Sequence, residues 1–177
     1  MLGLDIAAKR KRKISDYPYR LEYRTRWSDN DVFGHMNNPY YGVLCDSVAN
    51  QYLIERCGYS MHRSPQAAII AHTYFDYFGS VEYPGVLDVG LRVAKLGKSS
   101  VLYEVGVFKR GDPQVKAVGG SMHVWVSNDQ GVLGRPAPEG MPAHVRRAYE
   151  ALVEPGGKVE GEVDGQKKDG GKTKAKL

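Results

Sequence analysis

The chain of 177 residues is long enough for one domain with terminal extensions, and 42% of its residues are hydrophobic, which allows a substantial core. No apolar run approaches the roughly 18 residues that a membrane span needs, so we expect none. The net charge of +5 is concentrated at the ends, since residues 1–16 contain five basic and only two acidic residues. We therefore expect no nucleic-acid partner for the fold itself.

The two cysteines and the two chain ends bear on redox chemistry and localisation. Cys45 and Cys57 have neither zinc-site spacing nor a disulfide framework, so no metal is expected. The basic run Lys9–Lys13 interrupts any secretory signal, which indicates an intracellular protein. The final Ala175-Lys176-Leu177 resembles the peroxisomal address S-K-L. We expect peroxisomal localisation if an import receptor reads this tripeptide, and cytoplasmic localisation otherwise.

Composition divides the chain into three parts. Residues 1–16 are predicted to form a flexible basic arm, and residues 154–177 a disordered Gly/Lys tail. Such stretches bury too little apolar surface to offset the entropy lost on ordering. The domain is therefore predicted over residues 17–153.

The first elements of this domain are a strand and a long helix. From Tyr19 to Trp27 apolar residues and threonine alternate with polar ones, which predicts a strand with one face on the core. After a loop, Asn38-Pro39 is typical of an N-cap followed by proline at the first helical position. Apolar residues then recur at helical spacing until Gly58, a natural stop, which predicts a helix of about 19 residues.

The remainder of the domain gives mainly strand signals. Short turns join them, which indicates antiparallel hairpins. The predicted strands are Gln66–Phe78, Val86–Leu96, Ser100–Phe108 and Val115–Val126, and a closing helix is predicted within Pro142–Val153. The fold class is α+β, with an antiparallel five-stranded sheet wrapped around one long central helix. Because that helix is only partly apolar, we expect a second subunit to complete its burial.

The loop before the long helix concentrates polar chemistry. It contains Asp29, Asp31, Gly34, His35 and two asparagines just before a helix N-terminus. The first N–H groups of a helix lack internal partners and favour negative charge, so they can stabilise an oxyanion. Asp31 is the candidate nucleophile or general base, and His35 is a candidate helper for proton transfer or orientation. Each residue also has a non-catalytic alternative: Asp31 could be a turn or capping residue, and His35 could form a hydrogen bond that stabilises the loop. Asp29 is expected to be structural.

The pattern D-x-D-x-x-G-H-x-N-N-x-x-Y at residues 29–41 resembles the 4-hydroxybenzoyl-CoA thioesterase family of hotdog-fold proteins, and its acyl-CoA thioesterase branch in particular. The turn L-G-K-S-S at Leu96–Ser100 also resembles the family, and the resemblance covers about residues 17–150. It implies that Asp31 is the catalytic carboxylate. It also implies that the amide of Asn38 or its neighbours polarises the thioester carbonyl.

The resemblance further implies an assembly and a substrate. Family members form at least a homodimer, often a homotetramer, with acyl-CoA at the subunit interface and coenzyme A only as part of the substrate, so no separate cofactor is expected. The substrate-binding candidates are Gly34, Asn37, Tyr41, Arg92, Lys98, Ser99 and Ser100. Four aromatic residues of one strand are candidates for an acyl or aryl pocket or for core packing: Tyr74, Phe75, Tyr77 and Phe78.

Three functions follow from these patterns. The leading hypothesis is an acyl-CoA thioesterase of lipid metabolism, which hydrolyses the thioester to a free acid and CoA. The first alternative is a hotdog enoyl-CoA hydratase or dehydratase, because those enzymes also use an acid–base pair. The second alternative is a non-catalytic acyl-CoA-binding protein, although binding alone does not require the carboxylate of Asp31.

Overall fold

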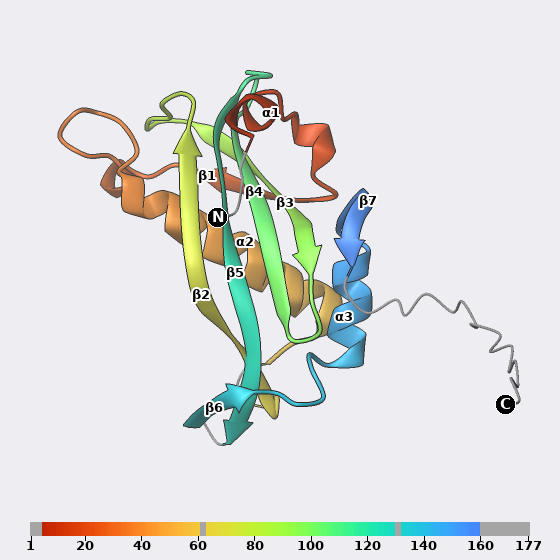
Figure 1. The fold of residues 1–177 in the computed structure, drawn as a ribbon. Helices are drawn as coiled ribbons and strands as arrows, with labels where there is room; N and C mark the ends of the chain where they lie inside the picture. The colour runs from red at the N-terminus through yellow and green to blue at the C-terminus, as the bar shows by residue number, and fades with distance from the viewer. Residues whose placement is uncertain (1–4, 61–62, 130–131, 160–177) are drawn as a thin grey trace, which may run out of the picture.

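One antiparallel sheet with a long helix across one face organises the chain (Figure 1). The computed structural model describes residues 5–60, 63–129 and 132–159. In chain order the elements are α1 (Ile6–Arg10), η1 (Ile14–Asp16), β1 (Tyr19–Arg24), η2 (Trp27–Asp29), α2 (Asn38–Cys57), β2 (Gln66–Tyr77), β3 (Val86–Leu96), β4 (Ser100–Lys109), β5 (Val115–Asp129), β6 (Val132–Pro136), α3 (Ala143–Glu150) and β7 (Val153–Val159). The sheet order is β1-β3-β4-β5-β2, with β6 paired to β5 and β7 to β3.

The α+β class and the hotdog architecture predicted from the sequence are confirmed. The described sheet has seven strands rather than five, because two short strands join it. β6 is five residues long, too short for a clear alternating pattern, and β7 contains the linker-like Pro155-Gly156-Gly157. The first strand ends at Arg24, earlier than predicted, because the chain turns into η2 at Trp27.

The long helix α2 starts and stops where its sequence dictates. Pro39 lies in its first turn, and Gly58 ends it with a φ of +59° while its N–H donates to the carbonyl of Ile54. The N-cap is Asn37 rather than the predicted Asn38, and the Asn37 side chain makes no capping hydrogen bond. The face that packs against the sheet consists of Tyr41, Leu44, Cys45, Val48, Ala49, Tyr52 and Leu53.

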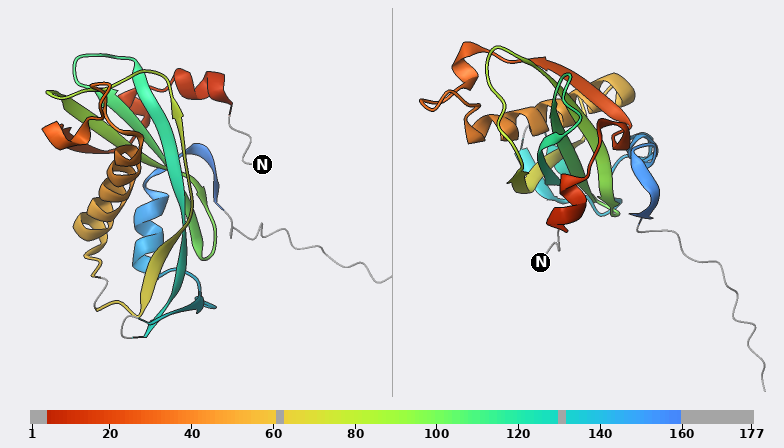
Figure 2. Two further views of the ribbon diagram at one scale, coloured as in Figure 1. Left: turned by 90° about the vertical axis from the view of Figure 1, so that its left-hand side faces the viewer. Right: turned by 90° about the horizontal axis from the view of Figure 1, so that it is seen from above.

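Two further helices lie on opposite sides of the sheet. Figure 2 shows α2 and α3 on one face and the short α1 on the other. The described helices include none with the length and apolar character that crossing a membrane requires. The start of the predicted disordered tail forms β7, which pairs in parallel with β3. Ala175-Lys176-Leu177 lies outside the described residues.

The N-terminal segment differs from the free arm that its composition predicted. Residues 5–16 lie against the outer face of the sheet, and Asp5 caps α1 by accepting from the amide of Ala7 at 3.0 Å. Lys9 is only 3% exposed, pairs with Asp76 and lies 4.3 Å from the ring centre of Tyr74. These contacts supply the stabilisation that the basic composition alone does not reveal. The boundary of the domain at residue 17 stays a prediction.

Tyr17 anchors this segment on a flat part of the sheet. Its ring crosses Gly90 of β3 and Gly106 of β4, where a Cβ atom would lie 2.5 Å from a ring atom in each case. Its hydroxyl donates to Glu104 at 3.2 Å, and Glu104 accepts from both Nε and Nη2 of Arg92 at 2.9 Å. Burial and the charge of Glu104 hold the pKa of Tyr17 above its ordinary value. The two glycines therefore leave the space that the Tyr17 ring occupies, which we call its seat.

Replacing Gly90 with alanine tests this seat. Gly90→Ala forces a methyl group into the Tyr17 ring, and we expect the free energy of unfolding to fall by about 2 kcal/mol in urea titrations. Gly42→Ala is the matched control, because a Cβ at this helical position meets nothing within 4 Å. The control should be neutral or raise stability by about 0.5 kcal/mol. Equal losses in both variants would contradict the seat.

Candidate active site

Asp29 holds together the two ends of the loop between β1 and α2. Its side chain is buried, and Oδ2 accepts from the hydroxyl of Tyr23 at 2.8 Å and the amide of Arg26 at 2.7 Å. Its carbonyl accepts from the amide of Asn37, the residue before the helix, at 2.8 Å. This matches the structural role predicted for Asp29 and fixes the loop against the start of α2.

Asp31 begins a tight turn inside this loop. Its amide donates to the carbonyl of His35 at 2.8 Å, and its Oδ1 accepts from the amide of Phe33 at 2.8 Å. Gly34 has a φ of +78°, a conformation that favours glycine, and donates to the carbonyl of Asp31. No hydrogen bond from the described residues reaches Oδ2. One carboxylate oxygen therefore holds the turn, and the other is available for chemistry.

A hollow of about 440 Å³ opens beside this carboxylate. It brings together six residues singled out from the sequence, namely Asp31, His35, Asn38, Tyr41, Tyr77 and Phe78. Its remaining lining residues are Phe33 and Met36 from the loop before α2, and Gly79 and Ser80, which follow β2. The first turn of α2 thus lies on one side and the end of β2 on the other.

The helix start offers fewer free N–H groups than predicted. The amide of Tyr40 donates to the carbonyl of Asn37 at 2.9 Å, so it is already engaged. Pro39 has no N–H. Within the described part of the chain, no acceptor outside the helix engages the amide of Asn38, which is also a lining residue of the hollow. Asn38 is therefore the best-placed backbone donor for negative charge.

Four of the predicted substrate-binding residues do not lie at this hollow: Arg92, Lys98, Ser99 and Ser100. Arg92 is buried on the outer face, where Glu104 binds its guanidinium. Lys98, Ser99 and Ser100 belong to the β3–β4 turn beside α3, far from the loop before α2 (Figure 1). There the carbonyl of Lys98 accepts from Met141 at 3.1 Å, and that of Ser99 accepts from Trp125 at 2.7 Å. Sequence spacing could not reveal that this turn lies at the other end of the helix.

The aromatic candidates on β2 separate into two groups. Tyr77 and Phe78 line the hollow, and the ring of Tyr77 meets that of Tyr41 edge-on at 5.0 Å. Tyr74 lies under Lys9 on the outer face, and Phe75 packs over Gly119 in the interior. Alternation along the strand sends Phe75 and Tyr77 toward α2 and Tyr74 and Phe78 to the outer face, so it separates inner from outer rings but does not indicate which rings reach the hollow. Nothing in the sequence indicated the contribution of Gly79 and Ser80.

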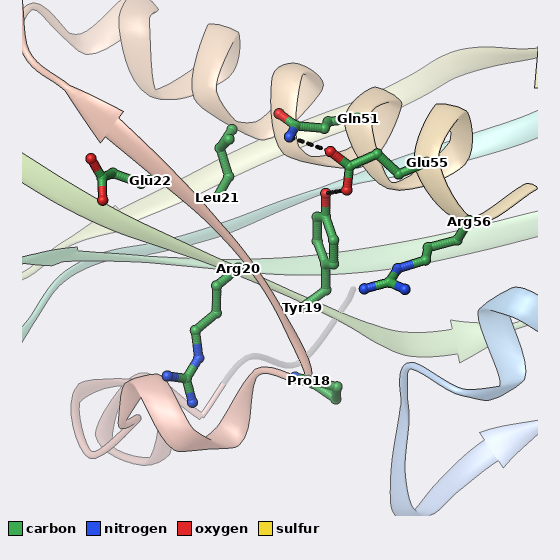
Figure 3. A pocket seen from close by; sticks show the side chains of 8 residues that line it. All are labelled: Pro18, Tyr19, Arg20, Leu21, Glu22, Gln51, Glu55 and Arg56. Atoms are coloured by element: carbon green, nitrogen blue, oxygen red, sulfur yellow. Dashed lines mark hydrogen bonds between the residues drawn. The ribbon is translucent and has the colours of Figure 1, made fainter. Parts of the chain in front are cut away.

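A larger hollow of about 590 Å³ lies between β1 and the second half of α2 (Figure 3). Two carboxylates line it. Glu22 accepts from Arg110 at 2.8 Å, and the two oxygens of Glu55 accept from Tyr19 at 2.6 Å and Gln51 at 2.7 Å. The hydrogen bonds to Glu55 hold its pKa below its ordinary value. Because both carboxylates already have partners and this hollow lies away from the start of α2, we take the hollow at Asp31 as the candidate active site.

A buried polar cluster lies between α2 and β5. Ser121 Oγ is 3.6 Å from the Cys45 thiol and 3.0 Å from Nε2 of His123. Burial raises the pKa of Cys45 to about 11, which keeps the thiol protonated. Burial also lowers the pKa of His123, and the charge of Asp46 opposes that shift in part. No described residue bonds to Nδ1 of His123.

The pKa of His123 makes stability depend on pH. Because the folded state disfavours the charged imidazole, the unfolded chain binds the extra proton first as pH falls below the ordinary value of 6.5. Stability should therefore fall below that pH, by up to about 1.4 kcal/mol per pH unit from this group. Urea unfolding at several pH values should show a shallower dependence for His123→Gln than for wild type. His72→Gln, at an exposed position of β2, should keep the wild-type dependence; equal slopes in all three proteins would refute this account.

No metal site is apparent beside these groups. In residues 5–60, 63–129 and 132–159, no three His, Cys, Asp or Glu side chains gather in a way that could hold a metal ion. The expectation that the protein needs no metal stays a prediction.

Comparison of the sequence with protein-family models identifies the family of this chain. The model of the thioesterase-like superfamily matches residues 25–149, most of the domain and all of the loop at Asp31. The chain belongs to the thioesterase-like superfamily. This thioesterase-like protein is accordingly a thioester hydrolase. The match does not distinguish the 4-hydroxybenzoyl-CoA branch, which stays a prediction. No curated protein matches the sequence.

Solved structures support the same fold. The PA5185 protein from Pseudomonas aeruginosa is 36% identical, with a TM-score of 0.74 over 80% of this chain and 96% of that one. A thioesterase from Thermus thermophilus, solved with coenzyme A and zinc, is 26% identical, with a TM-score of 0.64 over 77% and 95%. A 1,4-dihydroxy-2-naphthoyl-CoA thioesterase from Synechocystis shares the fold of this thioesterase-like chain at 17% identity, with a TM-score of 0.66 over 77% and 98%.

Proposed function

We propose that this thioester hydrolase cleaves acyl-CoA to a free acid and coenzyme A, with Asp31 as nucleophile or general base. The observation that carries the proposal is the common hollow of the Asp31 carboxylate and the first turn of α2. A thioester carbonyl in that hollow would meet a carboxylate on one side and a helix N-terminus on the other. The Thermus thermophilus relative with bound coenzyme A supports this choice of thioester.

The proposed chemistry requires only the thioester and water. Asp31 either attacks the carbonyl carbon, forming an anhydride that water then hydrolyses, or takes a proton from the water that attacks. In both routes the carbonyl oxygen gains negative charge, which the amide of Asn38 and the dipole of α2 stabilise. The thiolate of coenzyme A leaves and takes a proton. No cofactor takes part in the proposed reaction.

The walls of the hollow favour an apolar or aromatic acyl group. The rings of Tyr41 and Tyr77 meet edge-on and provide an aromatic surface. Burial raises the pKa of Tyr41 to about 12, so its hydroxyl stays neutral at physiological pH. His35 is exposed at the rim, where we propose that it orients the attacking water. Gly34 and Asn37 shape the loop and the helix start around the substrate.

Asp31→Asn tests this mechanism. Asparagine keeps an Oδ1 acceptor for the amide of Phe33, so the turn survives while the charged oxygen is lost. We expect the release of coenzyme A from a panel of acyl-CoAs, followed with a thiol reagent, to fall at least about 100-fold. Asp129→Asn, at an exposed position near the end of β5, should retain full activity. Wild-type rates in Asp31→Asn would refute the role of Asp31.

The same assay separates the two alternative functions. An enoyl-CoA hydratase would remove the absorbance of the conjugated thioester while leaving the thioester intact. A binding protein would bind acyl-CoA tightly in calorimetry without turnover. The superfamily match supports hydrolysis over both.

We further propose that a second copy of the chain completes the site. β2 is an edge of the sheet, and an unpaired edge is a template for pairing with another chain. Ile70 of β2 is 50% exposed, Tyr77 is 46% exposed and Val43 of α2 is 53% exposed. Tyr77 also lines the hollow, so a copy seated here would close its open side. This supports a homodimer or a homotetramer built from such dimers.

Ile70→Lys tests this assembly. A charge on the apolar edge should oppose pairing, so light scattering should show a shift from at least a dimer toward the mass of one chain. Acyl-CoA hydrolysis should fall with it, because the site loses one wall. Val132→Lys, on the exposed face of β6, should change neither mass nor activity. A wild-type monomer with full activity would overturn the proposal.

A further inference from the structure

The proposed substrate has an anionic end for which the Asp31 hollow itself offers no cation. Coenzyme A carries phosphate groups, whereas the lining of the hollow contains no arginine or lysine. Arg92 is buried in an ion pair with Glu104, and Lys98 lies at the β3–β4 turn near α3. Another basic group must therefore meet the phosphates if they are recognised by charge.

The helix α1 places such a group against a residue that lines the hollow. Lys9 fixes α1 against β2 by pairing with Asp76 and by packing on Tyr74. The guanidinium of the next residue, Arg10, lies over the ring of Phe78 at 5.5 Å from its centre. Phe78 is itself a lining residue of the hollow. Arg10 thus stands where the end of β2 meets the proposed site.

Arg10 also differs in its pairing from two lysines at this end of β2. Lys9 is neutralised by Asp76, and Lys116, which lies beside Gly79 at the same end of β2, binds Asp112 at 2.6 Å. Arg10 is exposed, and the described residues include no carboxylate that pairs with it. Its stacking on Phe78 holds the planar guanidinium in place while leaving its donors available. A guanidinium of this kind can bind a phosphate with two parallel hydrogen bonds.

We propose that Arg10 binds a phosphate of the coenzyme A portion of the substrate, an inference that rests on the proposed acyl-CoA hydrolysis. The N-terminal segment is then part of the binding site, although it lies outside the superfamily match at residues 25–149. The buried contacts of Lys9 and Tyr17 fix the N-terminal segment and thereby hold Arg10 over Phe78. If a second copy pairs at the edge of β2, Arg10 remains on the outer face of the sheet of its own chain.

Calorimetry with coenzyme A itself tests the inference without requiring turnover. Arg10→Gln should weaken binding about tenfold at low salt, and Arg10→Lys should recover only part of the loss, because it restores the charge but not the paired hydrogen bonds. Arg147→Gln removes an exposed cation from α3 and should bind as wild type does. Equal affinities for wild type and Arg10→Gln, or no binding of coenzyme A by wild type, would overturn the inference.

Hydrolysis of paired substrates separates this inference from the proposed function. One acyl group is presented as its CoA thioester and as its pantetheine thioester, which lacks the phosphates. The ratio of kcat/KM for the CoA thioester to kcat/KM for the pantetheine thioester should be about tenfold lower in Arg10→Gln than in wild type. The change should come from a higher KM for the CoA thioester. An unchanged ratio would overturn the role of Arg10 even if both thioesters are hydrolysed. If wild type hydrolyses neither, the proposed function fails, and the calorimetry still decides whether Arg10 binds coenzyme A.

Discussion

The packing of α2 against the sheet is the constraint on which the rest of the molecule depends. Its buried face includes Leu44, Val48, Ala49 and Leu53, all 1% exposed or less, and burial of each leucine or valine contributes about 1.5–3 kcal/mol. A helix held along its length in this way has a fixed beginning. The position of the first turn at Asn38, and with it the hollow, follows from a core contact rather than from local loop chemistry.

The loop before α2 then places its side chains relative to that fixed helix start. The side chain and the carbonyl of Asp29 accept hydrogen bonds from the two ends of the loop, whereas only Oδ1 of Asp31 accepts hydrogen bonds within its turn. The difference between the two carboxylates is therefore one of environment. Asp29 is enclosed and satisfied, while Asp31 faces an open hollow with one oxygen available. Such a division lets the same short segment be both rigid and reactive.

The outer face of the sheet has a different physical character. It holds buried charges beside a small apolar cluster around Tyr17: Lys9 pairs with Asp76, and Glu104 binds both Arg12 and Arg92. Removing such charges from water is costly, so each depends on its partner. This dependence gives the N-terminal segment a specific position, which an apolar contact would define less sharply. The segment that composition marks as a solvated arm is thereby positioned next to the site.

The sequence by itself determined the elements and the local chemistry. Alternation identified most strands, helical spacing and Gly58 identified α2, and the pattern around Asp31 and His35 predicted the loop of the candidate site. These features are periodic or local, so a linear chain displays them directly. Tertiary structure alone decided which distant residues share a surface. It placed Arg92 in the outer ion network and Lys98 at the far turn, and it brought Tyr77 to the hollow and Arg10 to the ring of Phe78. Such neighbours are set by strand pairing, helix packing and ion pairs across tens of residues, and no local pattern records them.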